Sequence, residues 1–235
     1  MKKILSMTFV MLVSCCLYGQ SSIQMYNKGC RMTEKGEYQA AINWFTKAIE
    51  LDQFFTEAYY NRALAKSKLK DYTSAIADYS RAIDIRPHFV LAYNNRGADR
   101  KEFGDLEGAI ADYTQAISLD TAYARAYYNR GIVRFVTGEI SSAIKDFTHA
   151  LRSAPDMIDA WFNRAVVKCL DGDHTGAISD LSRAIELNPG FANAYKERGL
   201  ARIKLGQQAT GMKDIEKARE LGCTVTEQEL VNNQE

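Results

Sequence analysis

One segment recurs along this chain at a fixed interval, and that recurrence limits the possible folds more than any other feature. Residues 58–87 read AYYNRALAKSKLKDYTSAIADYSRAIDIRP, and residues 92–121 read AYNNRGADRKEFGDLEGAIADYTQAISLDT. Residues 126–155 continue the series with AYYNRGIVRFVTGEISSAIKDFTHALRSAP. The interval is 34 residues, and six copies tile residues 22–225 without an insertion or deletion. A fixed period of this length is typical of a stacked repeat array.

Small residues occupy the same three places in the copies. The first is Gly or Ala, a second small residue follows twelve residues later, and an Ala follows after seven more. These residues are Gly29, Ala63, Gly97, Gly131, Ala165 and Gly199; Ala41, Ala75, Ala109, Ala143, Ala177 and Gly211; and Ala48, Ala82, Ala116, Ala150, Ala184 and Ala218. Small residues let two helices approach closely. Each copy is therefore predicted to be a pair of packed helices.

Turn and stop signals support the same division. Glycine stands between the two predicted helices at Gly36, Gly104, Gly138, Gly172 and Gly206. Such a glycine suits a helix C-terminus in the left-handed conformation. The second copy has Lys70 there, which should cost about 1 kcal/mol if the geometry is kept. The three prolines Pro87, Pro155 and Pro189 all lie just past a second helix, where proline ends it.

The repeat resembles the tetratricopeptide repeat in its length, its small residues, its proline stop and its leading aromatic. That aromatic is Tyr59, Tyr93, Tyr127, Trp161 or Tyr195. The resemblance covers residues 22–225 and implies an all-α, right-handed superhelical solenoid of twelve helices. The expected repeats are 22–55, 56–89, 90–123, 124–157, 158–191 and 192–225, within an array assigned to 20–225. Residues 226–235 are expected to form a short C-terminal cap and tail.

The N-terminus has the pattern of a secretory signal peptide over residues 1–19. Lys2 and Lys3 precede an apolar run and then small residues. A buried N-terminal helix is the alternative. Cleavage after Gly19 would release the protein, whereas the lipobox-like stretch ending at Cys15 would make that cysteine a lipidated first residue and attach the chain to a membrane. The sequence thus predicts an exported bacterial protein of the periplasm or outer membrane.

Composition and motifs argue against several functions. Cleavage after residue 19 removes two lysines and no acid, which changes the net charge from +1 to −1 and leaves no basic field for nucleic acid. Cys30, Cys169 and Cys223 are scattered and do not form a disulfide framework. The sequence contains no phosphate loop, nucleophile elbow or zinc-binding helix motif. We therefore expect no enzyme activity, cofactor, metal or small-molecule substrate.

A basic residue and an acid sixteen residues later recur in five copies. The pairs are Arg62 and Asp78, Arg96 and Asp112, Arg130 and Asp146, Arg164 and Asp180, and Arg198 and Asp214. The spacing predicts ion pairs between the two helices of each unit, because arginine can bind a carboxylate with two parallel bonds. A local alternative pairs the same acids with a base three residues away, such as Asp78 with Arg81. The first copy has Lys28 and Trp44 at these places.

A second recurrent set precedes those arginines. It consists of Tyr26, Asn27, Tyr60, Asn61, Asn94, Asn95, Tyr128, Asn129, Phe162 and Asn163. In the tetratricopeptide family, first helices line a concave groove, so the resemblance implies that these residues face a bound segment. Asparagine offers donors and acceptors to a peptide backbone, and a rigid aromatic side chain offers contact area. The alternative is that asparagine only ties one unit to the next.

The expected function is therefore binding of a protein or peptide partner by a non-enzymatic scaffold of the bacterial cell envelope. An extended segment of the partner would lie in the groove. Two alternatives stay open. The chain could be a structural subunit of an envelope assembly that uses its convex face or its ends, or an accessory subunit of an envelope enzyme.

Overall fold

The computed structural model describes residues 21–226, and every regular element in this part of the chain is a helix. The chain divides into two compact units, Met1–Leu119 and Asp120–Glu235. In the first unit, a helical stretch at 21–34 is followed by α2 (Tyr38–Leu51), α3 (Thr56–Lys68), α4 (Tyr72–Ile85), α5 (Val90–Phe103) and α6 (Leu106–Leu119). The second unit contains α7 (Ala124–Val136), α8 (Ile140–Ser153), α9 (Ile158–Leu170), α10 (His174–Leu187), α11 (Ala192–Lys204) and α12 (Gln208–Glu220).

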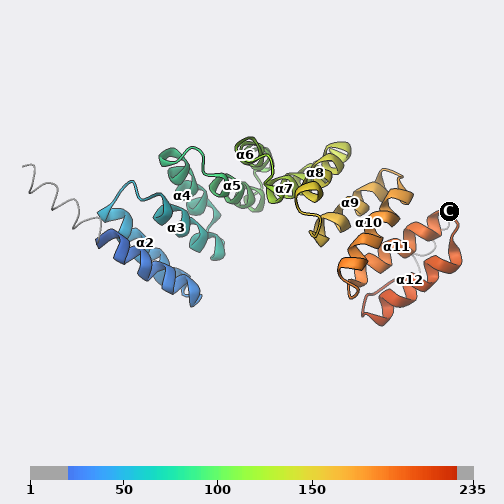
Figure 1. Cartoon of the computed structure of the whole chain (residues 1–235). Coiled ribbons are helices and arrows are strands. Elements are labelled where there is room, and N and C mark those ends of the chain that lie inside the picture. The colour runs from blue at the N-terminus through green and yellow to red at the C-terminus, as the bar shows by residue number, and fades with distance from the viewer. Residues whose placement is uncertain (1–20, 227–235) are drawn as a thin grey trace, which may run out of the picture. The chain divides into compact units, whose positions relative to one another are not determined.

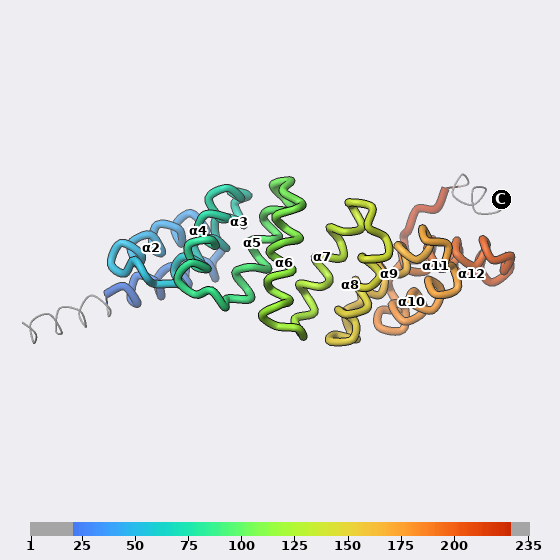
Figure 2. The backbone as a smooth tube through the Cα atoms, turned by 90° about the horizontal axis from the view of Figure 1, so that it is seen from above, coloured from blue at the N-terminus to red at the C-terminus, as the bar shows by residue number. Residues whose placement is uncertain are grey.

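Within each unit, every helix packs against the next one in the sequence, from α2 to α6 and from α7 to α12. Figure 1 shows α11 beside α12, and Figure 2 shows the same pair from above, at the red end of the tube. This tandem arrangement of helix-turn-helix pairs confirms the predicted all-α repeat fold. The handedness of a superhelix running through both units stays a prediction.

The recurrent small residues lie where the paired helices touch. Ala63, Ala75 and Ala82 of the second copy are fully buried. A Cβ atom added to Gly131 would lie 2.9 Å from a ring carbon of Phe147, which is closer than carbon atoms normally approach. Helices α7 and α8 are therefore close enough that the residue at this crossing must be small.

The turns between paired helices have the predicted left-handed conformation. The φ angles of Gly36, Gly104, Gly138, Gly172 and Gly206 are all positive. Lys70 has φ 62°, and it is the only non-glycine residue with positive φ in residues 21–226. The second copy thus keeps the turn geometry and carries the strain of a side chain in this region.

The helix ends follow local sequence signals. Helices α4, α8 and α10 end two residues before Pro87, Pro155 and Pro189, respectively. At the other end of α4 and α10, the carboxylates of Asp71 and Asp173 accept hydrogen bonds from backbone N–H groups of the first turn. These bonds satisfy donors that a helix leaves unpaired at its start.

The last helix pair is covered by the segment that follows α12. Val225 is buried against Leu200, Ile203 and Ile215, and Arg219 donates a hydrogen bond to the Val225 carbonyl oxygen at 3.4 Å. The sequence predicts one or two shielding helical turns from Thr226 onward, and most of that stretch lies outside the described residues. The predicted signal peptide and Cys15 lie outside them as well.

Candidate functional site

Each of the five arginine–aspartate pairs joins the two helices of one repeat. In the fifth copy, Arg164 of α9 donates to Asp180 of α10 from Nε to Oδ2 at 2.8 Å and from Nη2 to Oδ1 at 2.7 Å. The pairs at Asp78, Asp112, Asp146 and Asp214 have the same two-bond geometry. All five carboxylates are buried. The local alternative would pair Asp180 with Arg183, three residues later, but Arg183 forms its ion pair with Glu186 instead.

A second base contacts each of these carboxylates, which the sequence reasoning missed. Lys168 lies 2.9 Å from Asp180 Oδ2, and Arg134 lies 2.7 Å from Asp146 Oδ2. Lys66, Arg100 and Arg202 make the same contact in the other copies. The signal was present, because a lysine or arginine stands four residues after the paired arginine in all five copies. Each buried acid is therefore matched by two bases.

Four of these arginines also connect neighbouring repeats. Arg164 Nη1 donates to Thr148 Oγ1 of the preceding α8 at 3.0 Å, and Thr148 in turn donates to the Ile144 carbonyl oxygen. Arg62, Arg96 and Arg198 make equivalent bonds to Thr46, Ser80 and Ser182. The leading aromatic lies over the guanidinium, with Arg164 4.8 Å from the centroid of Trp161. One side chain thus links three helices.

The first copy replaces this network by a different contact. Lys28 Nζ lies 4.5 Å from the centroid of the Trp44 ring, at the two places where other copies carry arginine and aspartate. The joint change of both residues is explained by this cation–π contact, which needs no buried acid.

Three of the predicted groove asparagines bind the tyrosine hydroxyl of the preceding copy. The side-chain amides of Asn61, Asn95 and Asn163 donate to Tyr26, Tyr60 and Tyr128 at 2.6, 2.8 and 2.9 Å, respectively. Each of these bonds ties one repeat to the next, as the alternative to partner recognition predicts. For Asn61 and Asn163, the tie uses the amide nitrogen and leaves the side-chain oxygen as a further acceptor.

The remaining groove residues differ in exposure. Asn27 is exposed, Asn129 and Phe162 are partly buried, and Asn94 is only 2% exposed. Asn94 donates to the side-chain oxygen of Asn95 at 3.1 Å, so it lies beneath the surface that a partner would meet.

The aromatic members pack against a second aromatic residue that the sequence reasoning overlooked. Tyr60 lies 4.8 Å from Phe89, and Phe162 lies 4.9 Å from Phe191, between ring centroids. Tyr26 contacts Phe55 in the same way. The partner ring comes just before the next first helix, a place also held by Tyr123 and Met157. Each of these partly buried rings is thus held in place by a neighbouring ring.

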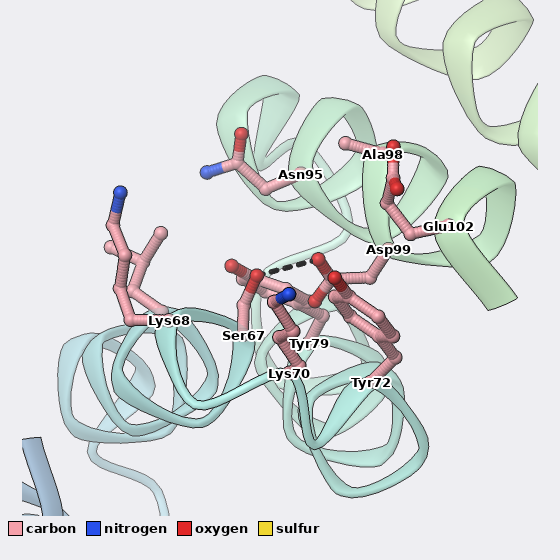
Figure 3. A pocket seen from close by; sticks show the side chains of 10 residues that line it. Ser67, Lys68, Lys70, Tyr72, Tyr79, Asn95, Ala98, Asp99 and Glu102 are labelled. Carbon is pink, nitrogen blue, oxygen red and sulfur yellow. Dashed lines mark hydrogen bonds between the residues drawn. The ribbon is translucent and has the colours of Figure 1, made fainter.

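A cavity of about 370 Å³ opens in the first unit beside one predicted groove residue, Asn95. Its wall includes Ser67 from α3, Tyr79 from α4 and Asp99 from α5. Figure 3 shows Asp99 directed toward Ser67, whose hydroxyl donates to Asp99 Oδ1 at 2.6 Å. Burial raises the pKa of Asp99 to about 6. The sequence reasoning did not select Asp99.

Three cysteines lie within the described residues 21–226. Cys30, Cys169 and Cys223 are free thiols. Burial raises the pKa of the Cys169 thiol to about 11, which keeps it protonated and weakly nucleophilic. Within residues 21–226, no helix combines the length and apolar character that a membrane crossing requires.

These features define a helical-hairpin repeat protein in which buried ion pairs join the two helices of a repeat and side-chain hydrogen bonds tie consecutive repeats together. Models of the tetratricopeptide repeat match residues 56–89 and 134–190, and a TPR repeat model matches residues 29–70 and 101–138. Together they cover more than half of the chain. The chain belongs to the tetratricopeptide repeat family, whose members are generally non-enzymatic protein-interaction scaffolds.

Solved structures show the same fold. The crystal structure of MamA is 28% identical with a TM-score of 0.65, over 68% of this chain and 93% of that one. PilF of Pseudomonas aeruginosa is 17% identical with a TM-score of 0.75, over 94% of this chain and 98% of that one. YrrB, described as a TPR protein with an unusual peptide-binding site, is 20% identical with a TM-score of 0.68, over 80% and 96% of the two chains. No curated protein matches the sequence.

Proposed function

We propose that this protein is a scaffold of the bacterial cell envelope that binds an extended segment of a partner protein along its first helices. The observation that carries this proposal is the recurrent pair of an aromatic ring and an asparagine on those helices. The pair occurs in four copies, the first, second, fourth and fifth, and three Asn–Tyr bonds tie consecutive copies together. An extended chain also presents its backbone groups at regular intervals.

The geometry favours recognition because the side chains are already ordered. A bound segment would pay little conformational entropy at rings fixed by Phe89 or Phe191, or at amides fixed by a tyrosine hydroxyl. The side-chain oxygens of Asn61 and Asn163 can accept from a backbone N–H of the partner. The peptide-binding site named for YrrB, a protein with the same fold, adds support.

A site-specific crosslinking experiment tests the groove. A photoreactive phenylalanine analogue at Phe162 keeps an aromatic ring there, whereas at Tyr128 it keeps the ring but removes the hydroxyl that accepts from Asn163. The same analogue at the exposed Ser141 of α8 is the control. We expect partner crosslinks in envelope extracts from the first two positions and none from Ser141. Crosslinks from Ser141 alone would instead favour a structural subunit that binds its partners through a surface outside the first helices.

Export rests on the basic and apolar pattern of residues 1–19. Metabolic labelling with a fatty acid separates the two processing routes. Label that disappears in Cys15→Ser would indicate a lipoprotein, whereas an unlabelled mature chain beginning after Gly19 would indicate a released periplasmic protein. Retention of residues 1–19 in the mature chain would contradict export by either route.

A further inference from the structure

The strongest feature outside the repeated network is the acid at the floor of the cavity between α3 and α5. Asp99 is 4% exposed, and its Oδ2 has no hydrogen-bond partner within the described residues. Only Ser67 donates to this carboxylate, at Oδ1. A buried carboxylate with an unused oxygen is costly, because the lost hydration is not replaced.

This acid is peculiar to one copy. The corresponding residues of the second, fourth, fifth and sixth copies are Ala65, Val133, Val167 and Ala201, all buried and apolar. The array therefore packs at this place without an acid. The five repeated aspartates have two bases each, whereas no base lies within 4 Å of Asp99 among residues 21–226. Asp99 thus lacks the structural role that explains the others.

The cavity around Asp99 is open to solvent, and its wall combines apolar side chains with charged groups. Lys68 and Lys70 lie at its rim with Glu102, and all three side chains are exposed. Figure 3 shows Asn95, Asp99 and Glu102 on one side of the cavity, along α5. A volume of about 370 Å³ lies within the usual range for ligand pockets, roughly 300–1,000 Å³.

Charge decides what the cavity can accept. The lysine ammonium groups at the rim are hydrated, so their fields are screened, whereas the buried carboxylate acts in a medium of low dielectric constant. Oδ2 requires a donor, and a donor that carries positive charge gains most from it. Glu102 at the entrance adds a second negative charge, although Lys101 pairs with it at 2.9 Å.

We propose that this cavity receives a lysine or arginine side chain of the bound protein segment, with Asp99 as its counter-ion. The proposal rests on the proposed function, since the segment that lies along Asn95 would bring the basic side chain to the cavity. The bound segment would then need a lysine or arginine at one position, whereas the rest of the groove would contact its backbone groups and apolar side chains.

The test uses the full-length protein and three matched peptides in an otherwise Gly/Ser sequence, with a central arginine, citrulline or glutamate. Citrulline keeps the shape of arginine without its charge. Binding is followed by the amide resonances of Ser67, Asn95 and Asp99. We expect the arginine peptide to shift these resonances and to bind at least about tenfold more tightly than the citrulline peptide, the effect of one charge-assisted hydrogen bond.

Substitutions test whether Asp99 causes the preference for the arginine peptide. Asp99→Asn and Asp99→Val, the residue of the fourth and fifth copies, should each remove the preference for arginine. Glu107→Gln, an exposed acid of α6, should leave it unchanged. Both Asp99 variants remove a buried charge, so they should fold, and thermal melting checks this.

Several outcomes would overturn the proposal. These are equal binding of the arginine and citrulline peptides, an unchanged preference in Asp99→Asn, and tighter binding of the glutamate peptide through Lys68 and Lys70. Equal binding of free arginine would indicate a small-molecule site instead. Crosslinking at Tyr128 and Phe162 is independent of this cavity, so a failure here leaves the proposed function standing, and a failure there does not alter the peptide result.

Discussion

Replacing Asp180 by asparagine should destabilise the second unit more than replacing either base that contacts it. Asp180 is the shared acceptor of Arg164 and Lys168, and its side chain is 4% exposed. The asparagine side chain would keep the shape but lose the charge, and its NH₂ group would face one of two cations. The two bases would then lie close together without a counter-charge.

The magnitude follows from the bonds that are lost. Removing one partner of a buried ion pair costs about 3–5 kcal/mol, because the remaining charge is left uncompensated. The arginine and lysine side chains are 12% and 17% exposed, so water relieves part of that cost, and we expect about 3 kcal/mol. Lys168→Met leaves both arginine bonds in place and should cost only about 1–2 kcal/mol.

Urea unfolding gives the free energy of unfolding for each variant. Hydrogen exchange in α9 and α10 measures the free energy of local opening, because the repeats of such a protein can open separately. A cycle that combines Arg164→Met with Asp180→Asn measures their coupling, which we expect to be about 1–3 kcal/mol. The control is Glu186→Gln, which removes an exposed ion pair with Arg183 and should change stability by less than about 0.5 kcal/mol.

A loss in Asp180→Asn no larger than that in Glu186→Gln would refute this reasoning. So would a coupling of zero between Arg164 and Asp180. Equal losses in Lys168→Met and Asp180→Asn would show that the two bases do not share the acid as the geometry implies.

Four further substitutions test single positions. Lys70→Gly should relieve the left-handed strain and stabilise the first unit by up to about 1 kcal/mol in urea unfolding, and Gly172→Ala should destabilise the second unit by a similar amount. Because burial raises the pKa of Asp99 to about 6, the contribution of this group to stability falls as pH rises from about 4 to about 6. Relative to wild type, Asp99→Asn should therefore gain on the order of 3 kcal/mol between pH 4 and pH 7, and a difference that does not change with pH would contradict this. Tyr128→Phe removes the acceptor of Asn163 and should cost about 1 kcal/mol by thermal melting, with no loss if the bond does not form in solution.

The sequence predicted those parts of the fold where every copy needs the same kind of residue at the same place. The close helix crossing at Gly131 could be predicted because only a small residue fits there. The turn at Lys70 could be predicted because the other copies have glycine there, the residue that best adopts a positive φ. The hydroxyl partner of Arg164 was missed, although Thr or Ser recurs sixteen residues before each paired arginine. To predict contacts between consecutive repeats, one must know the packing angle between the hairpins, and the repeat interval does not give that angle.

The candidate site was predictable only in its recurrent part. Asn163 and Tyr128 could be selected from their spacing, but not the bond between them, since either side chain can turn toward solvent or toward its neighbour. Asp99 was not selected because the search followed what the copies share. Its signal was a departure, an acid where four copies have Ala or Val, and its burial became visible only with α3 packed against α5.

Four of the paired arginines donate to a hydroxyl of the preceding hairpin, and this recurrence has an evolutionary consequence. Because donor and acceptor recur at one interval, excising residues 158–191 would bring Arg198 opposite Thr148, a hydroxyl of the kind it already binds at Ser182. Whole hairpins could thus be duplicated or deleted while the new junction finds matching partners. Lineages of such a chain can change length in steps of one hairpin.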